Sequence, residues 1–274
     1  MDAFNAIGTA FRTISEENKI WRVPVVLTGI SMAVLTVLGI GDDAELIAYR
    51  PDVAWEIAIP LVLLALLLRI PTFYYPTMAY KHRFNGEDIN EGKLLRESFI
   101  GGLKVILISI VYGLLAGFIA LLLLIPAIFL YLILPEPVSY VVAAIPAIPA
   151  VLFVLGLIAM MVPAYIWTED FSAGMDIIGA AWDEKKETMV YGFLLMLSVV
   201  GIVAAAGGIV LMISWMGGGA ITALVIGFID GALSELANTL ANVSGAEMFV
   251  RLTGRLTWRK RDEVSVDPDL LASL

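Results

Sequence analysis

Three ionisable residues stand inside otherwise apolar stretches of this chain, and they are the first candidates for chemistry. Arg69 follows a leucine-rich run, and Asp230 and Glu235 lie in the last apolar run. A charge within the bilayer is costly, so each such residue is by default a functional candidate. We expect Arg69 and Asp230 to pair inside the membrane, with Glu235 one turn closer to the cytoplasm. The pair would act either as a proton or ion relay or as a structural pair that orders the helices. Alternatively, the Arg69 side chain extends to the headgroups and forms no pair.

The other polar residues do not form a recognisable catalytic set. His82 is the single histidine and cysteine is absent, so thiolate and histidine ligand sets for zinc, haem or iron–sulfur clusters are missing. Ser244 lacks the histidine partner of a serine nucleophile. The acidic pairs Glu169-Asp170 and Asp183-Glu184 have the spacing of solvated helical ion pairs. We therefore expect no enzyme activity, no metal and no cofactor.

The composition is typical of a membrane protein. Of the 274 residues, 60% are hydrophobic and 16% are charged, and the mean hydropathy is +0.91. Soluble domains are nearer half apolar and a quarter charged. The net charge of -9 leaves no strongly basic face for nucleic acid, so the expected partner is the lipid bilayer.

Six apolar runs approach or exceed the roughly 20 residues that a membrane-spanning helix needs. They cover about 23–40, 53–80, 104–136, 136–169, 189–215 and 219–242. The third and fourth are longer than an upright helix requires and meet at a Pro-Glu-Pro turn, which predicts a hairpin of tilted or kinked helices. The expected kink points are Pro126, Pro146 and Pro149. The sequence predicts an all-α fold with about six transmembrane helices in residues 23–250.

Lysine and arginine alternate between the two sides of this arrangement. They fall in 1–22, 81–104, 185–186 and 251–261. The loops on the other side carry only Arg50. Because basic loops stay in the cytoplasm, the pattern predicts a multi-pass protein of the cell membrane with both termini cytoplasmic.

The two ends of the chain have separate characters. Four apolar residues recur at helical spacing near the start, namely Phe4, Ile7, Phe11 and Ile14. They predict that residues 1–22 form an amphipathic cytoplasmic segment, which lies in the membrane interface or packs on protein. Residues 251–274 are predicted to be a basic flank followed by a loose tail.

Small residues spaced four apart indicate faces where transmembrane helices can pack closely. Such pairs are Gly113 with Gly117, Gly201 with Ala205, and Gly227 with Gly231. They predict packing between helices of one chain, and a homodimer face is the alternative.

Two cytoplasmic loops resemble each other. The segment 70–74 is similar to 162–166, and downstream of each, 99–103 is similar to 189–193. Both loops face the same side, so these segments are candidates for a parallel internal repeat.

Three short motifs carry a resemblance to a known family. They are Phe-Asn-Gly-Glu at 84–87, Gly-Gly-Leu-Lys at 101–104 leading into 110–112, and Ala-Ala-Trp at 180–182. The chain resembles a family of uncharacterised multi-pass archaeal and bacterial membrane proteins, known as a domain of unknown function. The resemblance covers roughly residues 55–250. It implies a six-helix integral membrane fold and an archaeal source, and it implies no activity.

Two classes of function fit these patterns. The first is a structural, scaffold or accessory component of a membrane assembly, holding a membrane-protein partner or a second copy of the chain. The second is a small transporter or channel for an ion or small solute, using Arg69 and Asp230. A polar stripe shared by Ser198, Ser214, Thr222 and Asp230 would favour the second class.

Overall fold

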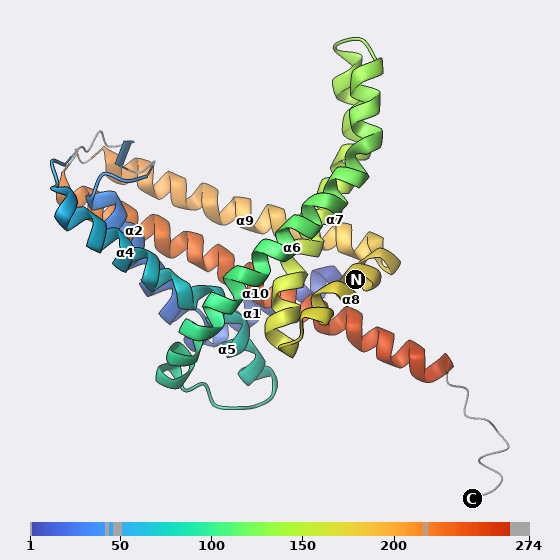
Figure 1. Ribbon diagram of the computed structural model, residues 1–274, viewed down its shortest axis with the longest axis horizontal. Helices are drawn as coiled ribbons and strands as arrows, with labels where there is room; N and C mark the ends of the chain where they lie inside the picture. The colour runs from blue at the N-terminus through green and yellow to red at the C-terminus, as the bar shows by residue number, and fades with distance from the viewer. Residues whose placement is uncertain (1, 42–43, 46–50, 216, 218, 264–274) are drawn as a thin grey trace, which may run out of the picture.

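The computed structural model describes residues 2–41, 44–45, 51–215, 217 and 219–263, with side chains described as far as Gly254 (Figure 1). The long helices are α2 (Arg22–Val37), α4 (Trp55–Arg69), α6 (Glu91–Ile133), α7 (Val138–Thr168), α9 (Lys185–Ser214) and α10 (Ala220–Glu263). The shorter ones are α1 (Asp2–Glu16), α5 (Tyr75–Phe84) and α8 (Phe171–Asp183), with 3-10 turns η1 (Asn18–Ile20) and η2 (Ile70–Phe73). No strand occurs within these described residues, so the prediction of an all-α fold is confirmed.

Five helical segments in the described part of the chain are long and apolar enough to cross a bilayer. They are Trp55–Phe84, Glu91–Ile133, Val138–Thr168, Lys185–Ser214 and Ala220–Gly254. The first predicted run is shorter than expected, because α2 has 16 residues, or about 24 Å against a hydrocarbon thickness of roughly 30 Å. The helix ends where Gly39 and Gly41 adopt φ values of 76° and 103°, a conformation that glycine reaches at little cost.

The long helices diverge from a shared base (Figure 1). The α6–α7 hairpin projects away from the other long helices, and we call its distal part, residues 118–148, the α6–α7 arm. Helices α2, α4 and α9 extend together in another direction with the first half of α10. The turn between α6 and α7 and the turn between α9 and α10 therefore lie at the far ends of two separate groups.

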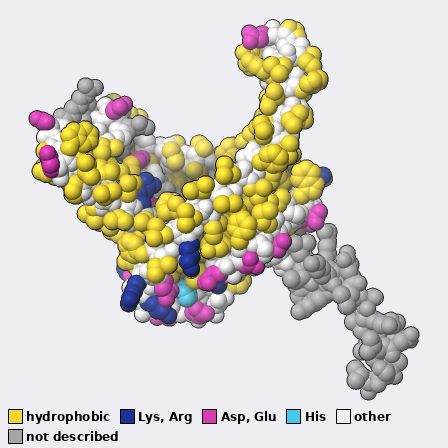
Figure 2. All heavy atoms as spheres, viewed as in Figure 1, with side chains coloured by type: hydrophobic (Ala, Val, Ile, Leu, Met, Phe, Trp, Pro, Cys, Tyr) yellow, Lys and Arg dark blue, Asp and Glu magenta, His cyan; other side chains and the backbone are white. Residues whose placement is uncertain are grey.

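The buried core lies at the base rather than in the arm. The side chains of Leu157, Met160 and Met161 on α7 are fully buried against Tyr191 of α9 and Met248 of α10. Large apolar side chains cover the arm instead, as Figure 2 shows. The helices are thus held together where α7, α9 and α10 cross.

The predicted kink points lie within continuous helices. Pro126 is inside α6, and Pro146 and Pro149 are inside α7. The last helix also continues beyond the predicted end of its apolar run near Asn242, as one helix of 44 residues. Residues 264–274, which include most of the predicted tail, lie outside the described residues.

The N-terminal helix packs on protein through a face of small residues. Ala3, Ala6 and Ala10 are fully buried against α9 and α10. Phe4 and Phe11 are 63% and 48% exposed. One side of α1 is therefore fixed on the bundle while its two aromatic side chains face outward.

Glycines allow the closest helix crossings. A Cβ atom added to Gly227 would lie 2.7 Å from the carbonyl oxygen of Met32, and one added to Gly231 would lie 2.7 Å from that of Thr28. This pair therefore packs directly on α2. The other predicted small-residue faces are open, because no atom lies within 4 Å of a Cβ at Gly113, Gly117 or Gly201, and Ala205 is exposed.

A further crossing, between α7 and α9, was not predicted from the sequence. A Cβ atom on Gly192 would lie 2.0 Å from the carbonyl oxygen of Leu152, and a Cβ atom on Gly156 would lie 2.4 Å from that of Thr188. The two glycines face each other across the crossing. Any larger side chain there must push the helices apart.

Candidate functional site

Arg69 and Asp230 do not form the predicted pair. Arg69 ends α4, and its buried Nε has no hydrogen-bond partner. Asp230 lies in α10, where its side chain is half-buried. Neither residue has an ion-pair partner within 4.0 Å among the described residues. The expected depth is similar, but the two side chains do not meet.

Glu235 is the carboxylate on which the bundle converges. It is 3% exposed, and its Oε2 accepts a hydrogen bond of 3.0 Å from Oγ1 of Thr28 on α2. Its Oε1 accepts one of 3.0 Å from Nδ2 of Asn238, one turn later on α10. Arg69 is near enough to attract it electrostatically, and Thr72 of η2 lies close to it. A buried carboxylate needs such donors, because desolvation without them costs several kcal/mol.

The hydrogen bonds continue along one face of α10. Nδ2 of Asn242 donates to the carbonyl oxygen of Asn238 at 2.9 Å and to its Oδ1 at 3.2 Å. The Asn238 amide nitrogen thus donates to the carboxyl group, and the Asn242 amide nitrogen donates to Asn238. We call Thr28, Glu235, Asn238 and Asn242 the Glu235 network.

A cavity of about 280 Å³ adjoins this network between α6, α7 and α10. Its polar lining comes from Ser109 and Tyr112 of α6 and from Asn238 and Asn242 of α10, and the Tyr112 hydroxyl already donates to the carbonyl oxygen of Phe171. The rest is apolar, including Phe73 of η2 and Ile158 of α7. We call it the α6–α10 cavity.

The sequence reading missed the two asparagines and Thr28. A signal for the asparagines exists, since Glu235, Asn238 and Asn242 are spaced three and four apart and so share one helix face. Thr28 carries no such signal, because its proximity depends on how α2 packs on α10.

A second buried carboxylate, Glu247, differs from Glu235 in having a charged partner. It is 6% exposed, accepts a hydrogen bond from the Tyr80 hydroxyl of α5, and pairs with Arg251, whose Nε lies 2.8 Å away. Its hydrogen-bonding capacity is used within the fold, so it fixes α5 on α10.

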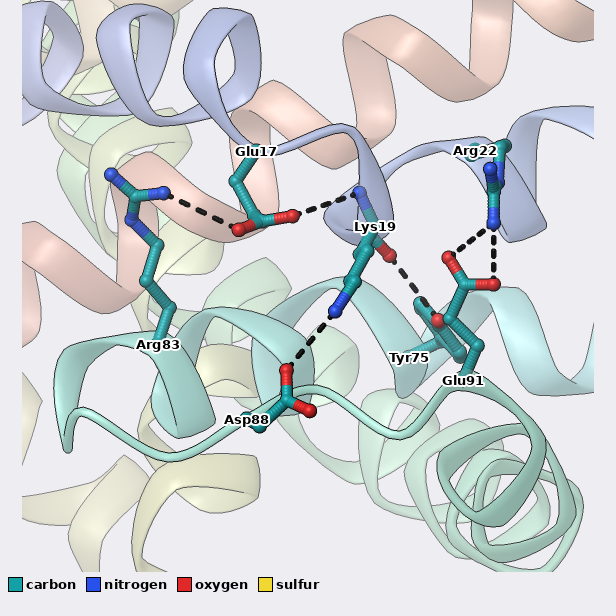
Figure 3. Close-up of polar contacts among 7 residues, drawn as sticks. All are labelled: Glu17, Lys19, Arg22, Tyr75, Arg83, Asp88 and Glu91. Carbon is teal, nitrogen blue, oxygen red and sulfur yellow. Dashed lines mark hydrogen bonds and ion pairs between the residues drawn. The ribbon is translucent and has the colours of Figure 1, made fainter.

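The base carries a set of exposed ion pairs that we call the N-terminal clasp (Figure 3). Lys19 contacts Asp88 at 3.0 Å, and Arg22 contacts Glu91 at 2.6 Å. Lys19 hydrogen-bonds Asp88, which lowers the pKa of Asp88 and raises the pKa of Lys19. The clasp ties the segment between α1 and α2 to the loop before α6.

Two more contacts complete the clasp. Arg83 of α5 lies 3.7 Å from Glu17, and the Tyr75 hydroxyl donates to the carbonyl oxygen of Lys19 at 3.2 Å (Figure 3). Beside it, a hydrogen bond with His82 lowers the pKa of Glu87. Within the described residues, no three or more His, Asp and Glu side chains gather to hold a metal ion. The clasp is therefore an ionic fastening between segments.

Two of the serines that a polar stripe with Asp230 would include satisfy their hydroxyls within α9. Ser198 donates back to the carbonyl oxygen of Leu194, and Ser214 to that of Leu211. Neither serine lines the α6–α10 cavity.

Comparison of the chain with protein-family models, with curated proteins and with solved structures gave no match in any of the three.

Proposed function

We propose that this chain is a non-enzymatic integral membrane component that scaffolds or assists a membrane assembly. The observation that carries the proposal is the α6–α7 arm. Leu121, Ile125 and Phe129 on α6 and Val141 and Ile145 on α7 are 54% to 70% exposed. The outward faces of the hairpin are thus free of the remaining described helices, while its proximal part, at Leu123 and Pro146, lines a pocket with Trp182 of α8. A separate arm offers an intramembrane surface for a partner protein or a second copy.

The same proposal includes six crossings, with α2 as the short first one. Its 16 residues pack between α4 and α10, and local thinning of the bilayer accommodates a helix of this length. Both termini then lie on the cytoplasmic side of the cell membrane. Gathering of α1, α5 and α8 at the base, where many of the lysines and arginines lie, supports that orientation. Phe4 and Phe11 of α1 are directed into the interface in this arrangement.

The natural absence of cysteine allows a direct test of the topology. Single-cysteine variants Asn5→Cys and Asp52→Cys, both at exposed positions, flank α2. A membrane-impermeant maleimide should label Asp52→Cys in intact cells and Asn5→Cys only after permeabilisation. Glu136→Cys and Asn85→Cys, on either side of α6, serve as the matching pair for a long helix. Labelling of Asn5→Cys and Asp52→Cys from the same side would overturn the six-crossing topology.

The partner surface is tested by photo-crosslinking in native membranes. A photoreactive amino acid at Ile125 in the arm should yield a protein adduct of defined mass. A control at Leu197 of α9, which is similarly exposed at 58% against 54%, should yield lipid adducts alone. Absence of protein adducts at Ile125, together with solute flux by the purified chain in liposomes, would refute the scaffold role.

A small transporter or channel is the second candidate function. The Glu235 network and its adjoining cavity favour it, in place of the Arg69 and Asp230 pair expected from the sequence. Intramembrane carboxylates with polar neighbours occur along ion and proton pathways. Flux of protons or small cations in liposomes that is lost in Glu235→Gln would support this function over the scaffold.

A further inference from the structure

The Glu235 network ends at Asn242, a residue that lines the α6–α10 cavity. Because Nδ2 of Asn238 donates to Glu235 and Nδ2 of Asn242 donates to Asn238, Oδ1 of Asn242 is left at the open end of the chain of hydrogen bonds. No donor reaches this oxygen from the described residues, and it is not sealed off in the interior. The network therefore presents a hydrogen-bond acceptor to whatever enters the cavity.

Ser109 supplies the complementary group from α6. Its hydroxyl lines the same cavity and has no hydrogen-bond partner among the described residues. A serine hydroxyl both donates and accepts. The polar part of the cavity can thus accept a hydrogen bond at Asn242 and donate one from Ser109, which is the pattern that a ligand hydroxyl satisfies.

The site lies at the boundary between the hydrocarbon layer and the headgroups. Asn238 and Asn242 lie about 27 Å and about 33 Å along α10 from Ala220, at 1.5 Å per residue. Against a hydrocarbon layer roughly 30 Å thick, the cavity therefore spans the depth at which the polar end of an amphiphile meets its acyl chains. A molecule that supplies hydrogen bonds to the polar lining there is stabilised relative to an alkyl chain.

The remaining lining selects against charged ligands. No lysine or arginine is among the described residues that line the cavity, so a phosphate has no counter-charge. The carboxylate of Glu235 is already engaged by Thr28 and Asn238, so a cation gains little from it. Phe73, Ile158 and Val162 provide apolar contacts, and Phe73 is 38% exposed at the side. The lining suits a neutral group attached to hydrocarbon.

We propose that the α6–α10 cavity binds the hydroxyl end of an uncharged membrane amphiphile of the diacylglycerol type. A volume of about 280 Å³ corresponds to roughly nine water-sized volumes of 30 Å³. It holds the hydroxyl and the first few carbons, while the acyl chains lie along the exposed surface of α6. This lipid site is independent of the scaffold role and would stand if that role failed.

Two photoreactive lipids test the site in liposomes that contain the purified full chain. One is a diacylglycerol with a diazirine near the glycerol, and the other is the same molecule with its hydroxyl methylated. Labelled peptides are then identified by mass spectrometry. The lipid with the free hydroxyl should label the cavity-lining peptides of α6 and α10 about fivefold more than the methylated lipid does. This ratio corresponds to one net hydrogen bond of about 1 kcal/mol.

Gly113 and Gly117 provide a matched pair of variants. Both have open space at the Cβ position, but only Gly113 lines the cavity. Gly113→Leu should reduce labelling by the free alcohol to the level of the methyl ether, and Gly117→Leu should leave it unchanged. Asn242→Leu should abolish the difference between the two lipids.

Each other outcome would overturn the proposal. Equal labelling by the two lipids in the unaltered chain excludes recognition of the hydroxyl, whatever the variants do. Equal labelling of Gly113→Leu and Gly117→Leu places the bound lipid elsewhere. Stronger competition by phosphatidic acid than by unlabelled diacylglycerol would identify a phosphate site instead.

Discussion

Replacement of Gly192 by alanine tests the α7–α9 crossing on which the core depends. The added Cβ would start 2.0 Å from the carbonyl oxygen of Leu152, whereas ordinary contact begins at 3.4 Å. The helices must therefore separate by about 1.4 Å where Tyr191 and Leu157 are fully buried. Overpacking of this kind destabilises the fold by about 1–3 kcal/mol. Alanine is a better helix former than glycine, which offsets about 0.5–1 kcal/mol of that loss.

The expected net loss for Gly192→Ala is about 1–2 kcal/mol, or roughly 3–8 °C in the unfolding midpoint. Gly201→Ala, later in the same helix, is the matched control because nothing lies within 4 Å of its Cβ position. That variant should be neutral or stabilised by up to about 1 kcal/mol.

Thermal unfolding in detergent, followed by tryptophan fluorescence, gives both midpoints. Gel filtration before heating shows whether each variant is folded and of the same size. If Gly192→Ala unfolds at or above the temperature of Gly201→Ala, the close crossing of α7 and α9 is refuted.

Three further predictions concern charged groups. Because Lys19 lowers the pKa of Asp88 in the folded chain, their contact stabilises the fold fully at pH values above 3.8, the ordinary pKa of aspartate. This stabilisation is lost as the pH falls through the lowered pKa. Asp88→Asn should therefore remove part of the acid dependence of the unfolding midpoint below about pH 5. Arg69 and Asp230 form no ion pair, so the stability lost in the double variant should equal the sum of the losses in Arg69→Gln and Asp230→Asn, within about 0.5 kcal/mol. A larger departure from that sum would contradict the geometry. Glu235→Leu should lower stability by about 1–3 kcal/mol, since its donors lose their acceptor, and a midpoint equal to that of the unaltered chain would show that the network is not formed.

The existence of the long helices was predictable from the sequence, but α6 begins before its apolar run and α10 continues beyond its own. Apolar run length is a property of the chain itself, and the four runs from 104 to 242 correspond to α6, α7, α9 and α10. The length of α2 was not predictable from apolarity alone. Apolar residues continue to Ile40, but backbone conformation at Gly39 ends the helix earlier.

The side-chain partners were harder to predict, for a physical reason. Sequence position gives a residue its depth along a helix, but rotation and crossing angle decide which side chains meet. Asp230 and Arg69 do not meet, whereas Glu235, on another face of α10, accepts a hydrogen bond from Thr28 of α2. For the same reason, spacing identified Gly227 and Gly113 equally, although only Gly227 has atoms of another helix within 4 Å of its Cβ position.

The matched loop segments illustrate a similar limit. Gly102 and Gly192 occupy corresponding positions of the apparent repeat, and both pack on a carbonyl oxygen of a preceding element. Gly102 packs on Ile70, inside the matched segment, but Gly192 packs on Leu152, well before the corresponding segment begins. Similarity of sequence thus does not carry over into equivalent contacts at these positions.

The contact between α2 and α10 has a consequence for the order in which the protein is made. Helix α2 packs most extensively against α10, and α1 also depends on it. About 180 residues separate Val37 from Ala220, so at 5–20 residues per second the ribosome needs roughly 10–40 s to supply the partner. During that time the short helix α2 lacks Phe228 of α10, which packs on Gly29 in the folded protein. A nascent chain halted before α10 emerges therefore exposes an incompletely stabilised first helix, which makes it the natural substrate for membrane quality control.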